Sequence, residues 1–425
     1  MFLYGSIQSI KKRQNNRLPI GCNDISPPLV QKHLGKPKLQ FLFRLGSVKI
    51  KKCGIPVLQK KRIPLRARMR RARGTDETAD EFMHATILAM ILPVTIVFLV
   101  TVIAYGAALK IFPVLGLLDF PERYGLKRQR LPYPTGIVAV LVFILAGFFL
   151  LPHGQKEIGV LIAVTLLSVT SFIDDRTPLP SSLRLLIQIV IVTVIFLTGS
   201  QIYTLTNPFG GFLKLDSFLL NTSMFGPLPV LSGIFTIFWL LLTINALNWF
   251  DGIPGQVNVI ALIGFLMLGL LALFRNGEPD VALLCFSLAA IAGAGILFDF
   301  PPGKMLMGDT GSMFFGLMLG LLGVYHGGKV ATAFLAFGIP LIDAMFVILR
   351  RIHAGHSPFR GGKDHLHHLL LARGWSPRHI VCLTAMIATT FGGGALFLST
   401  AQKAIAGVML IVLVGSIHFW IHSKK

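Results

Sequence analysis

The sequence predicts an all-α integral membrane protein with about 11 transmembrane helices and an active site on the cytoplasmic face. Of the 425 residues, 53% are hydrophobic and only 14% are charged, against roughly 25% charged in an average soluble domain. Apolar runs of about 17–25 residues recur along the chain, which is the length that crosses a bilayer as a helix. These observations exclude a soluble globular protein. They also exclude a β-barrel, whose strands would alternate over about 10 residues.

Residues 1–82 form a basic extension that differs from the rest of the chain. They hold 19 Lys and Arg against 5 Asp and Glu, whereas residues 83–425 hold 21 and 13. Such a tail would suit an anionic lipid surface or a nucleic acid. We instead interpret it as disordered, or as the product of a gene start placed too early, with the true start at Met69 or Met83. We expect no nucleic-acid partner, and we interpret residues 83–425 as one polytopic membrane domain.

Eleven apolar runs are the predicted spans, and the eighth is the shortest. They cover about residues 85–109, 136–152, 158–173, 183–199, 229–247, 256–274, 280–298, 312–325, 329–349, 379–398 and 402–422. One set of alternate connections, which includes the C-terminus, holds sixteen Lys and Arg, and the other set holds five. Because basic loops face the cytoplasm, the first set is inside and the N-terminus is outside. An exported tail with 19 basic residues contradicts this rule, so we do not expect residues 1–82 to belong to the working protein.

Four polar motifs lie in connections predicted to face the cytoplasm. A pair of aspartates follows span three, NALNWFDGIPG ends span five, MGDTGS precedes span eight, and PLIDAMFVILRR leads from span nine into HAGHSPFRGGKDHLHH. Ionisable residues beside membrane spans are few and mark functional sites. The candidate residues in or near these motifs are Asp174, Asp175, Arg184, Asn245, Asn248, Asp251, Asp309, Arg360, Lys363, His365, His367 and His368.

The chemistry of this set indicates a phosphate-binding site. Carboxylate and amide oxygens are hard ligands that suit Mg²⁺, whose coordination is usually completed by water and substrate phosphates. Gly308 and Gly311 would let the backbone approach a phosphate closely. Spans four and eight start on the inner side, so we expect their N-terminal amides to face an anion there. Arg184, Arg360, Lys363 and the histidines add positive charge.

Each motif also has a plainer interpretation. Asp174 and Asp175 could form a solvated turn, the amides at the end of span five could be helix caps, and Ser312 could be an N-cap. Asp343 lies seven residues before Arg350 on one helical face, and we interpret these two as a structural ion pair. A transporter is a rival class, but it would place ionisable residues near mid-membrane, whereas these acids lie at one edge.

The four motifs, in the order DD, NxxNxxDG, MGDxGS and PxxD followed by SPFxxxxDHLHH, resemble those of the polyprenyl-phosphate N-acetylhexosamine-1-phosphate transferases, glycosyl transferase family 4. The resemblance covers about residues 110–375. The last loop resembles the bacterial undecaprenyl-phosphate N-acetylglucosamine-1-phosphate transferases of O-antigen (lipopolysaccharide) and teichoic-acid synthesis.

The resemblance implies a multi-pass enzyme of a bacterial inner membrane with its active site facing the cytoplasm. It would transfer a sugar-1-phosphate from a UDP-sugar to a polyprenyl phosphate and release UMP, as the first membrane step of cell-envelope glycan synthesis. A phospho-N-acetylmuramoyl-pentapeptide transferase-like activity and a catalytically inactive lipid-binding member are the alternatives.

The resemblance also implies roles for individual residues. Asn248 and Asp309 would bind Mg²⁺, with Mn²⁺ as the alternative ion. Asp174, Asp175 and Asp251 are the implied catalytic acids, the first two near the acceptor phosphate and the third at the nucleotide end. The implied substrate-binding residues are Arg184, Asn245, Arg360, His365, His367 and His368. The implied partners are the polyprenyl phosphate lipid, the UDP-sugar and the membrane, and a homo-oligomer remains open.

The chain departs from the family pattern at four places. Arg184 stands where the family usually has Lys, and Pro254 replaces the second acid of its DGxDG. Gln129 lies where many members have a His three residues before Pro-x-Pro, and the paired glycines after that motif are reduced to Gly136. The departures at Pro254, Gln129 and Gly136 affect the expected identity of the donor more than the expected reaction.

Overall fold

The computed structural model describes residues 65–124, 128–207, 209–223, 226–325, 330–357 and 362–423. All contacts reported below lie within one compact unit, Arg66–Lys425. The extension predicted over residues 1–82 lies mostly outside the described residues. Its last part, from Leu65, belongs to the first described helix, so the expected boundary at residue 82 falls inside a helix.

The described chain is mostly helical, as the sequence predicts. In order, its helices are α2 (Leu65–Val114), η1 (Pro121–Tyr124), α3 (Gly136–Leu150), α4 (Gln155–Arg176), α5 (Ser181–Leu197), α6 (Val230–Phe250), α7 (Gln256–Leu271), η2 (Ala272–Asn276), α8 (Pro279–Asp299), α9 (Gly308–Tyr325), α10 (Val330–His353), α11 (Leu366–Ala372), α12 (Pro377–Ala395) and α13 (Thr400–Ser423). Each of the eleven predicted apolar runs corresponds to one of these helices, the sixth continuing through η2.

Seven of these helices are long and apolar enough to cross a membrane. They are Met83–Val114 of α2, α4, α6, α7 with η2, α8, α10 and α13. α3 and α5 are also apolar but shorter. The described residues therefore form a helical protein with seven candidate membrane spans, and the count of eleven remains a prediction.

Two short antiparallel strand pairs join α5 to α6. Strand β1 (Thr204–Thr206) pairs with β2 (Phe212–Lys214), and β3 (Leu219–Thr222) pairs with β4 (Gly226–Pro229). The prediction of an all-α chain missed these strands. Strands of three or four residues are too short to show the alternation of apolar and polar residues by which a strand is recognised.

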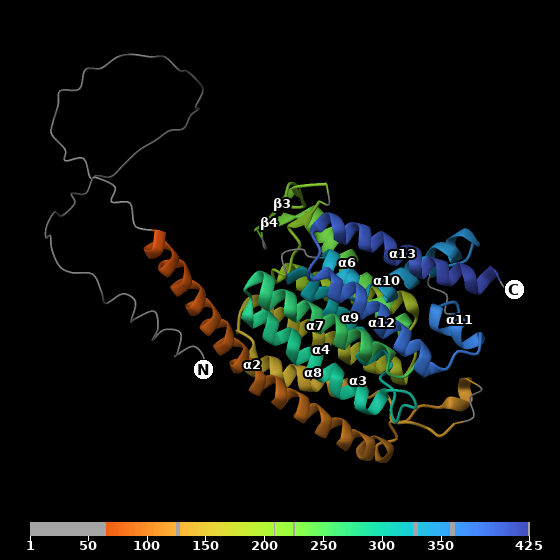
Figure 1. Cartoon of the computed structure of the whole chain (residues 1–425). Helices are drawn as coiled ribbons and strands as arrows, with labels where there is room; N and C mark the ends of the chain where they lie inside the picture. The colour runs from red at the N-terminus through yellow and green to blue at the C-terminus, as the bar shows by residue number, and fades with distance from the viewer. Residues whose placement is uncertain are drawn as a thin grey trace, which may run out of the picture. The chain divides into compact units, whose positions relative to one another are not determined.

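Helix α9 is the buried centre of the bundle (Figure 1). Every residue from Thr310 to Val324 is buried. Glycines let α9 approach its neighbours closely, as small residues do between membrane helices. A Cβ on Gly316 would lie 2.6 Å from the carbonyl oxygen of Thr243 on α6, and one on Gly311 would lie 2.8 Å from the Cα of Gly136 on α3. The position of α9 fixes its N-terminus, where MGDTGS lies.

Helix α10 is interrupted at Phe337, whose φ and ψ are −132° and 28°. Pro340 lies three residues later inside the same helix. Proline lacks a backbone N–H and its ring crowds the preceding turn, so helices kink at this kind of position. The part of α10 beyond this kink carries Asp343.

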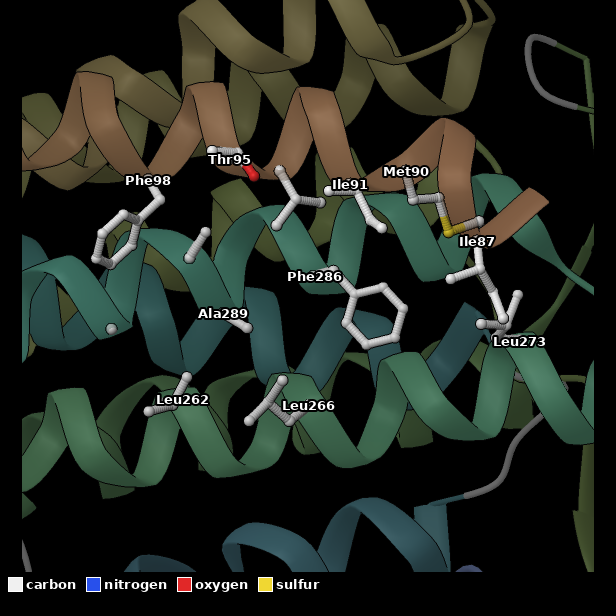
Figure 2. Close-up of a pocket in the computed structure, with 13 residues that line it drawn as sticks. Ile87, Met90, Ile91, Thr95, Phe98, Leu262, Leu266, Leu273, Phe286 and Ala289 are labelled. Atoms are coloured by element: carbon white, nitrogen blue, oxygen red, sulfur yellow. The ribbon is translucent and has the colours of Figure 1, made fainter. Parts of the chain in front are cut away.

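Helix α2 packs loosely against α7 and α8. Among the seven candidate spans it has the lowest buried share. A cavity of about 500 Å³ lies between the three helices, and Thr95 is the only polar side chain among the lining residues (Figure 2). The lining side chains labelled in Figure 2 are Ile87, Met90, Ile91, Thr95, Phe98, Leu262, Leu266, Leu273, Phe286 and Ala289. This cavity offers none of the charged groups that phosphate chemistry needs.

Candidate active site

The polar motifs meet at one end of the helices. The aspartate pair ends α4, Asn248 and Asp251 lie at the end of α6, and Asp309 begins α9. Trp249 at this end of α6 lies beside His365, with ring centroids 5.9 Å apart. The strand pairs precede the other end of α6, so Figure 1 shows β3 and β4 away from α11. The expectation that these motifs share one face is met by the geometry of the described residues.

Asp175 joins α4 to the N-terminus of α9. Its Oδ1 accepts a hydrogen bond from the backbone N–H of Asp309 at 2.8 Å and one from the hydroxyl of Tyr133. Its Oδ2 accepts from the backbone N–H and the hydroxyl of Thr310, at 3.0 and 2.6 Å. Negative charge at a helix N-terminus is stabilising. The first amides of α9 therefore bind a carboxylate of the chain itself, not the substrate anion that we expected them to face.

Tyr133 belongs to the loop before α3, which reads LPYPTG. Removal from water, together with the nearby Asp175 carboxylate, raises the pKa of its hydroxyl, so Tyr133 stays protonated and donates. The same loop is tied to the segment before α9, because the backbone N–H of Thr135 donates to the carbonyl oxygen of Leu306 at 2.9 Å. Tyr133 is not among the sequence-based candidates; its place between two prolines in the Pro-x-Pro loop was the available signal.

Arg184 bridges two acids. Its Nη1 lies 2.9 Å from Oδ2 of Asp174 and 3.4 Å from Oδ2 of Asp309. The other oxygen of Asp174 accepts from the backbone N–H of Leu179 at 2.6 Å. The Asp174 side chain is only 5% exposed, whereas that of Arg184 is 36% exposed. Asp174 thus holds a guanidinium that an incoming anion can reach.

The two predicted metal ligands lie next to each other. Nδ2 of Asn248 donates to Oγ of Ser312 at 3.3 Å, and Ser312 lies one turn after Asp309 on α9. Among the described residues, no three His, Cys, Asp or Glu side chains are grouped as a metal site. One carboxylate and one amide oxygen fit Mg²⁺ nonetheless, because this ion is usually held by one or two carboxylates, with water and substrate phosphates completing its shell.

His367 packs against the loop that follows α6. A Cβ on Gly252 would lie 1.9 Å from Nε2 of His367, so a residue without a side chain is needed there. His367 is buried, and in the described part of the chain neither of its ring nitrogens has a hydrogen-bond partner. Burial and the nearby His368 lower the pKa of His367 to about 3, so the ring is neutral at pH 7. Buried polar atoms normally have partners, so these two nitrogens stand out among the buried polar atoms of the described residues.

Asp251 connects the histidines to the acids. It directly precedes Gly252, and partial burial raises the pKa of its carboxyl well above the usual range. The charges of Asp299, Asp309 and Asp175 raise this pKa further. Asp251 is thus close to the acids at the α9 N-terminus as well as to the loop on which His367 packs.

A second cavity is lined by residues of this site. Its volume is about 300 Å³. Arg184, Asn245 and Asn248 lie in its wall, and the amide of Asn245 is held by Oε1 of Gln188 at 2.7 Å. The apolar side chains in the wall are Leu185, Phe238, Leu241, Leu242, Trp249, Met313 and Ile348. The cavity therefore combines an apolar wall with polar groups from α5 and from the motif at the end of α6.

The predicted ion pair between Asp343 and Arg350 is wrong. Asp343 instead binds two histidines, through Nδ1 of His365 and Nε2 of His418, each at 2.9 Å. Arg350 pairs with Asp364 at 3.1 Å. Although the helical spacing puts residues 343 and 350 on one face, the long guanidinium reaches forward into the next loop, and the buried carboxylate is satisfied by imidazoles.

The described residues thus form two adjoining groups. The first consists of Asp174, Asp175, Arg184, Asn245, Asn248 and Asp309. The second consists of Asp251, His365, His367 and His368, whose rings at 367 and 368 have centroids 4.1 Å apart. Arg360 lies outside the described residues. Tyr133, Gln188, Thr310 and His418 contact these residues although none of them is among the sequence-based candidates.

Known proteins share this sequence pattern. The profile of glycosyl transferase family 4 matches residues 157–327, a range that includes the motifs at Asp174, Asn248 and Asp309. A probable undecaprenyl-phosphate N-acetylglucosaminyl 1-phosphate transferase of Bacillus subtilis is 29% identical over 347 residues, which are 79% of this chain and 91% of that protein. Undecaprenyl-phosphate alpha-N-acetylglucosaminyl 1-phosphate transferases of Yersinia pestis and Salmonella typhi are 26% and 27% identical, covering 71% and 75% of this chain and 82% and 86% of theirs. The chain thus resembles glycosyl transferase family 4 over residues 157–327, and the described parts of its motifs come together at one end of the helical bundle.

Proposed function

We propose that this protein transfers an N-acetylhexosamine 1-phosphate group from a UDP-sugar to undecaprenyl phosphate and releases UMP. The contacts among the motifs carry the proposal: Arg184 joins the acid that ends α4 to the acid that begins α9. The relatives' names specify N-acetylglucosaminyl 1-phosphate and undecaprenyl phosphate, so we propose N-acetylglucosamine as the sugar. No observation favours the pentapeptide transferase or the inactive alternative.

The proposed reaction joins two anions. An oxygen of the lipid phosphate attacks the β-phosphorus of the UDP-sugar, and the bond from that phosphorus to the bridging oxygen breaks, so UMP leaves with this oxygen. Two unit charges 4 Å apart repel by about 4 kcal/mol at an effective dielectric constant near 20. The site must therefore supply positive charge before the two substrates can approach each other.

Arg184 suits the acceptor phosphate. It is fixed by Asp174 and partly exposed, and it lies in the wall of the cavity of about 300 Å³. The apolar wall of this cavity fits the beginning of a polyprenyl chain that enters sideways from the bilayer. A phosphate monoester has a second pKa of about 6, so the acceptor is already largely ionised near neutral pH. A strong base is not required, and Asp174 is proposed to orient Arg184 and the acceptor.

The two predicted metal ligands of the first group, together with the second group, suit the donor. Asp309 and Asn248 would hold Mg²⁺, which neutralises the diphosphate and stabilises the leaving phosphate when bound. His367 has two buried nitrogens without partners in the described region and lies against Gly252. His365 and His368 lie beside it. We assign these three histidines to the donor diphosphate and Asp251 to its nucleotide end.

We further propose that the protein lies in a bacterial inner membrane with this site on the cytoplasmic face, where UDP-sugars occur. The basic residues of the connections support this orientation, because sixteen of them lie on the side of the motifs.

Radiolabel transfer tests the proposed function. Membranes that contain the protein are incubated with undecaprenyl phosphate and a panel of labelled UDP-sugars, with Mg²⁺ present or chelated. We expect label from UDP-N-acetylglucosamine in the lipid fraction, release of UMP, and loss of both on chelation. A protein that is folded in the membrane but transfers label from none of these donors would overturn the proposal.

A further inference from the structure

A buried carboxylate on α10 links three separate segments of the chain. The Asp343 side chain is 1% exposed. Its Oδ2 lies 2.9 Å from Nδ1 of His365, and its Oδ1 lies 2.9 Å from Nε2 of His418. Oδ1 also accepts the backbone N–H of Leu366, the first residue of α11, at 2.8 Å. Asp343 therefore ties the end of α13 to the start of α11.

These contacts determine which nitrogen of the His365 ring carries the proton and how the ring is oriented. An ionised carboxylate only accepts hydrogen bonds, so Nδ1 of His365 carries a proton. In a neutral imidazole the other nitrogen, Nε2, is then an acceptor, and the ring cannot turn without breaking the bond to Asp343. The carboxylate thus decides which nitrogen of His365 carries the proton and how the ring is placed.

The position of the His365 ring in turn helps to position His367, one of the histidines assigned to the donor diphosphate. The rings of His365 and His367 are parallel within 6°, with centroids 6.1 Å apart, and His367 packs on Gly252. A continuous row of contacts therefore runs from His418 on the last helix through Asp343 and His365 to the loop after α6. No substrate contact is needed from His418 itself.

We propose that His418 is a positioning residue for the sugar-nucleotide donor, acting through Asp343 on His365. The inference rests on the proposed function. Loss of the group that holds a metal-liganding histidine typically costs about 10–100-fold in affinity, and we take the lower end of that range for His418, which reaches His365 only through Asp343. His418 also stacks on Phe346, with centroids 5.5 Å apart and an angle of 30°, so plain packing is the competing explanation.

Two substitutions separate positioning from packing. His418→Gln keeps an N–H donor near the place of Nε2 but removes the ring. His418→Phe keeps a ring that can stack on Phe346 but removes the donor. Positioning predicts that Gln is the better replacement, whereas packing predicts that Phe is. His153→Phe is the matched control, because His153 is exposed and lies between α3 and α4, in the connection at the other end of α4 from the aspartate pair.

The experiment measures kcat and the KM values for donor and acceptor in the full-length protein. We expect His418→Phe to raise the KM for the UDP-sugar about tenfold while the KM for undecaprenyl phosphate stays unchanged. His418→Gln should remain within about twofold of the wild type. A folded His418→Phe protein with the wild-type donor KM, a His418→Gln protein more impaired than His418→Phe, or equal rises in both KM values would overturn the inference.

Equilibrium binding of UDP to the purified protein keeps this inference separate from the proposed function. If the wild type transfers no sugar phosphate, the proposed function fails, and UDP binding still decides the role of His418. Weaker UDP binding by His418→Phe than by His418→Gln supports positioning, and equal binding by both variants and the wild type rejects it.

Discussion

Thr310 donates two hydrogen bonds to the same carboxylate oxygen, Oδ2 of Asp175, one from its backbone N–H at 3.0 Å and one from its hydroxyl at 2.6 Å. Asp175 thereby caps the N-terminus of α9 although it belongs to α4. The neighbouring Asp174 binds Arg184. The two adjacent acids thus have different contacts, one holding helices together and the other holding a cation at the site.

Replacing Asp175 with Ala should destabilise the protein. The substitution leaves two amides and a hydroxyl at the start of α9 without their acceptor, and loss of a helix cap costs about 1–2 kcal/mol. We expect a lower melting temperature for the detergent-solubilised protein. Asp216→Ala, which removes an exposed acid between β2 and β3, is the control and should leave the melting temperature unchanged. Equal melting temperatures for the two variants would refute the capping role.

Replacing Asp309 with Asn should abolish transfer at low Mg²⁺ while the folded protein remains in the membrane. Asp309 is the carboxylate next to Asn248 at the α9 N-terminus, so loss of its charge should weaken metal binding most. We expect activity to recover partly as Mg²⁺ rises, which is measured as transfer against Mg²⁺ concentration.

Asp280→Asn is the control for this experiment. Asp280 is exposed in the first turn of α8, whose other end, at Asp299, is the end near Asp251. This variant should show the Mg²⁺ dependence of the wild type. Near-normal turnover of Asp309→Asn at limiting Mg²⁺ would show that Asp309 is not a metal ligand.

The sequence predicted the helices and the shared face of the motifs because both depend on local patterns. The length of each apolar run indicates a helix. The uneven distribution of Lys and Arg between alternate connections assigns each motif to one side of the membrane. It could not tell Asp174 from Asp175, because their different contacts depend on Thr310 and Arg184, which lie on other helices. Nor could it find the partners of Asp343, since His418 is separated from it by 75 residues. Helical spacing pointed to Arg350 instead.

Replacing Gly252 with Ala should impair donor binding. The added Cβ would lie 1.9 Å from Nε2 of His367, so the ring or the loop must move, and such overpacking typically costs about 1–3 kcal/mol. We expect a higher KM for the UDP-sugar and an unchanged KM for undecaprenyl phosphate. Gly393→Ala is the matched control, because a Cβ at Gly393 of α12 would meet no atom within 4 Å. A Gly252→Ala protein with the control's donor KM would contradict the proposed contact.

A chain that starts at Met83 should be as active as the full-length chain. It keeps the candidate span Met83–Val114 and lacks the extension with 19 Lys and Arg, whose charge conflicts with the predicted outer N-terminus. The measurement is transfer activity per amount of inserted protein for the two chains. A shortened protein that inserts normally but transfers nothing would show that the extension takes part in function.

The orientation of the motifs can be tested with single cysteines. In a background without the four native cysteines, Lys214→Cys should react with a membrane-impermeant thiol reagent added outside intact cells, whereas Arg176→Cys and Lys363→Cys should react only after permeabilisation. All three positions are exposed, so burial does not protect any of them. Arg176 ends α4 beside the aspartate pair, and Lys363 lies just before the histidines. If the cysteine at 363 reacted from outside while the one at 176 did not, the two would lie on opposite sides of the membrane. His367 contacts Gly252, and the loop that holds Gly252 lies near the acids at the α9 N-terminus. Positions 363 and 176 on opposite sides of the membrane would contradict this arrangement. The proposed site would then be wrong.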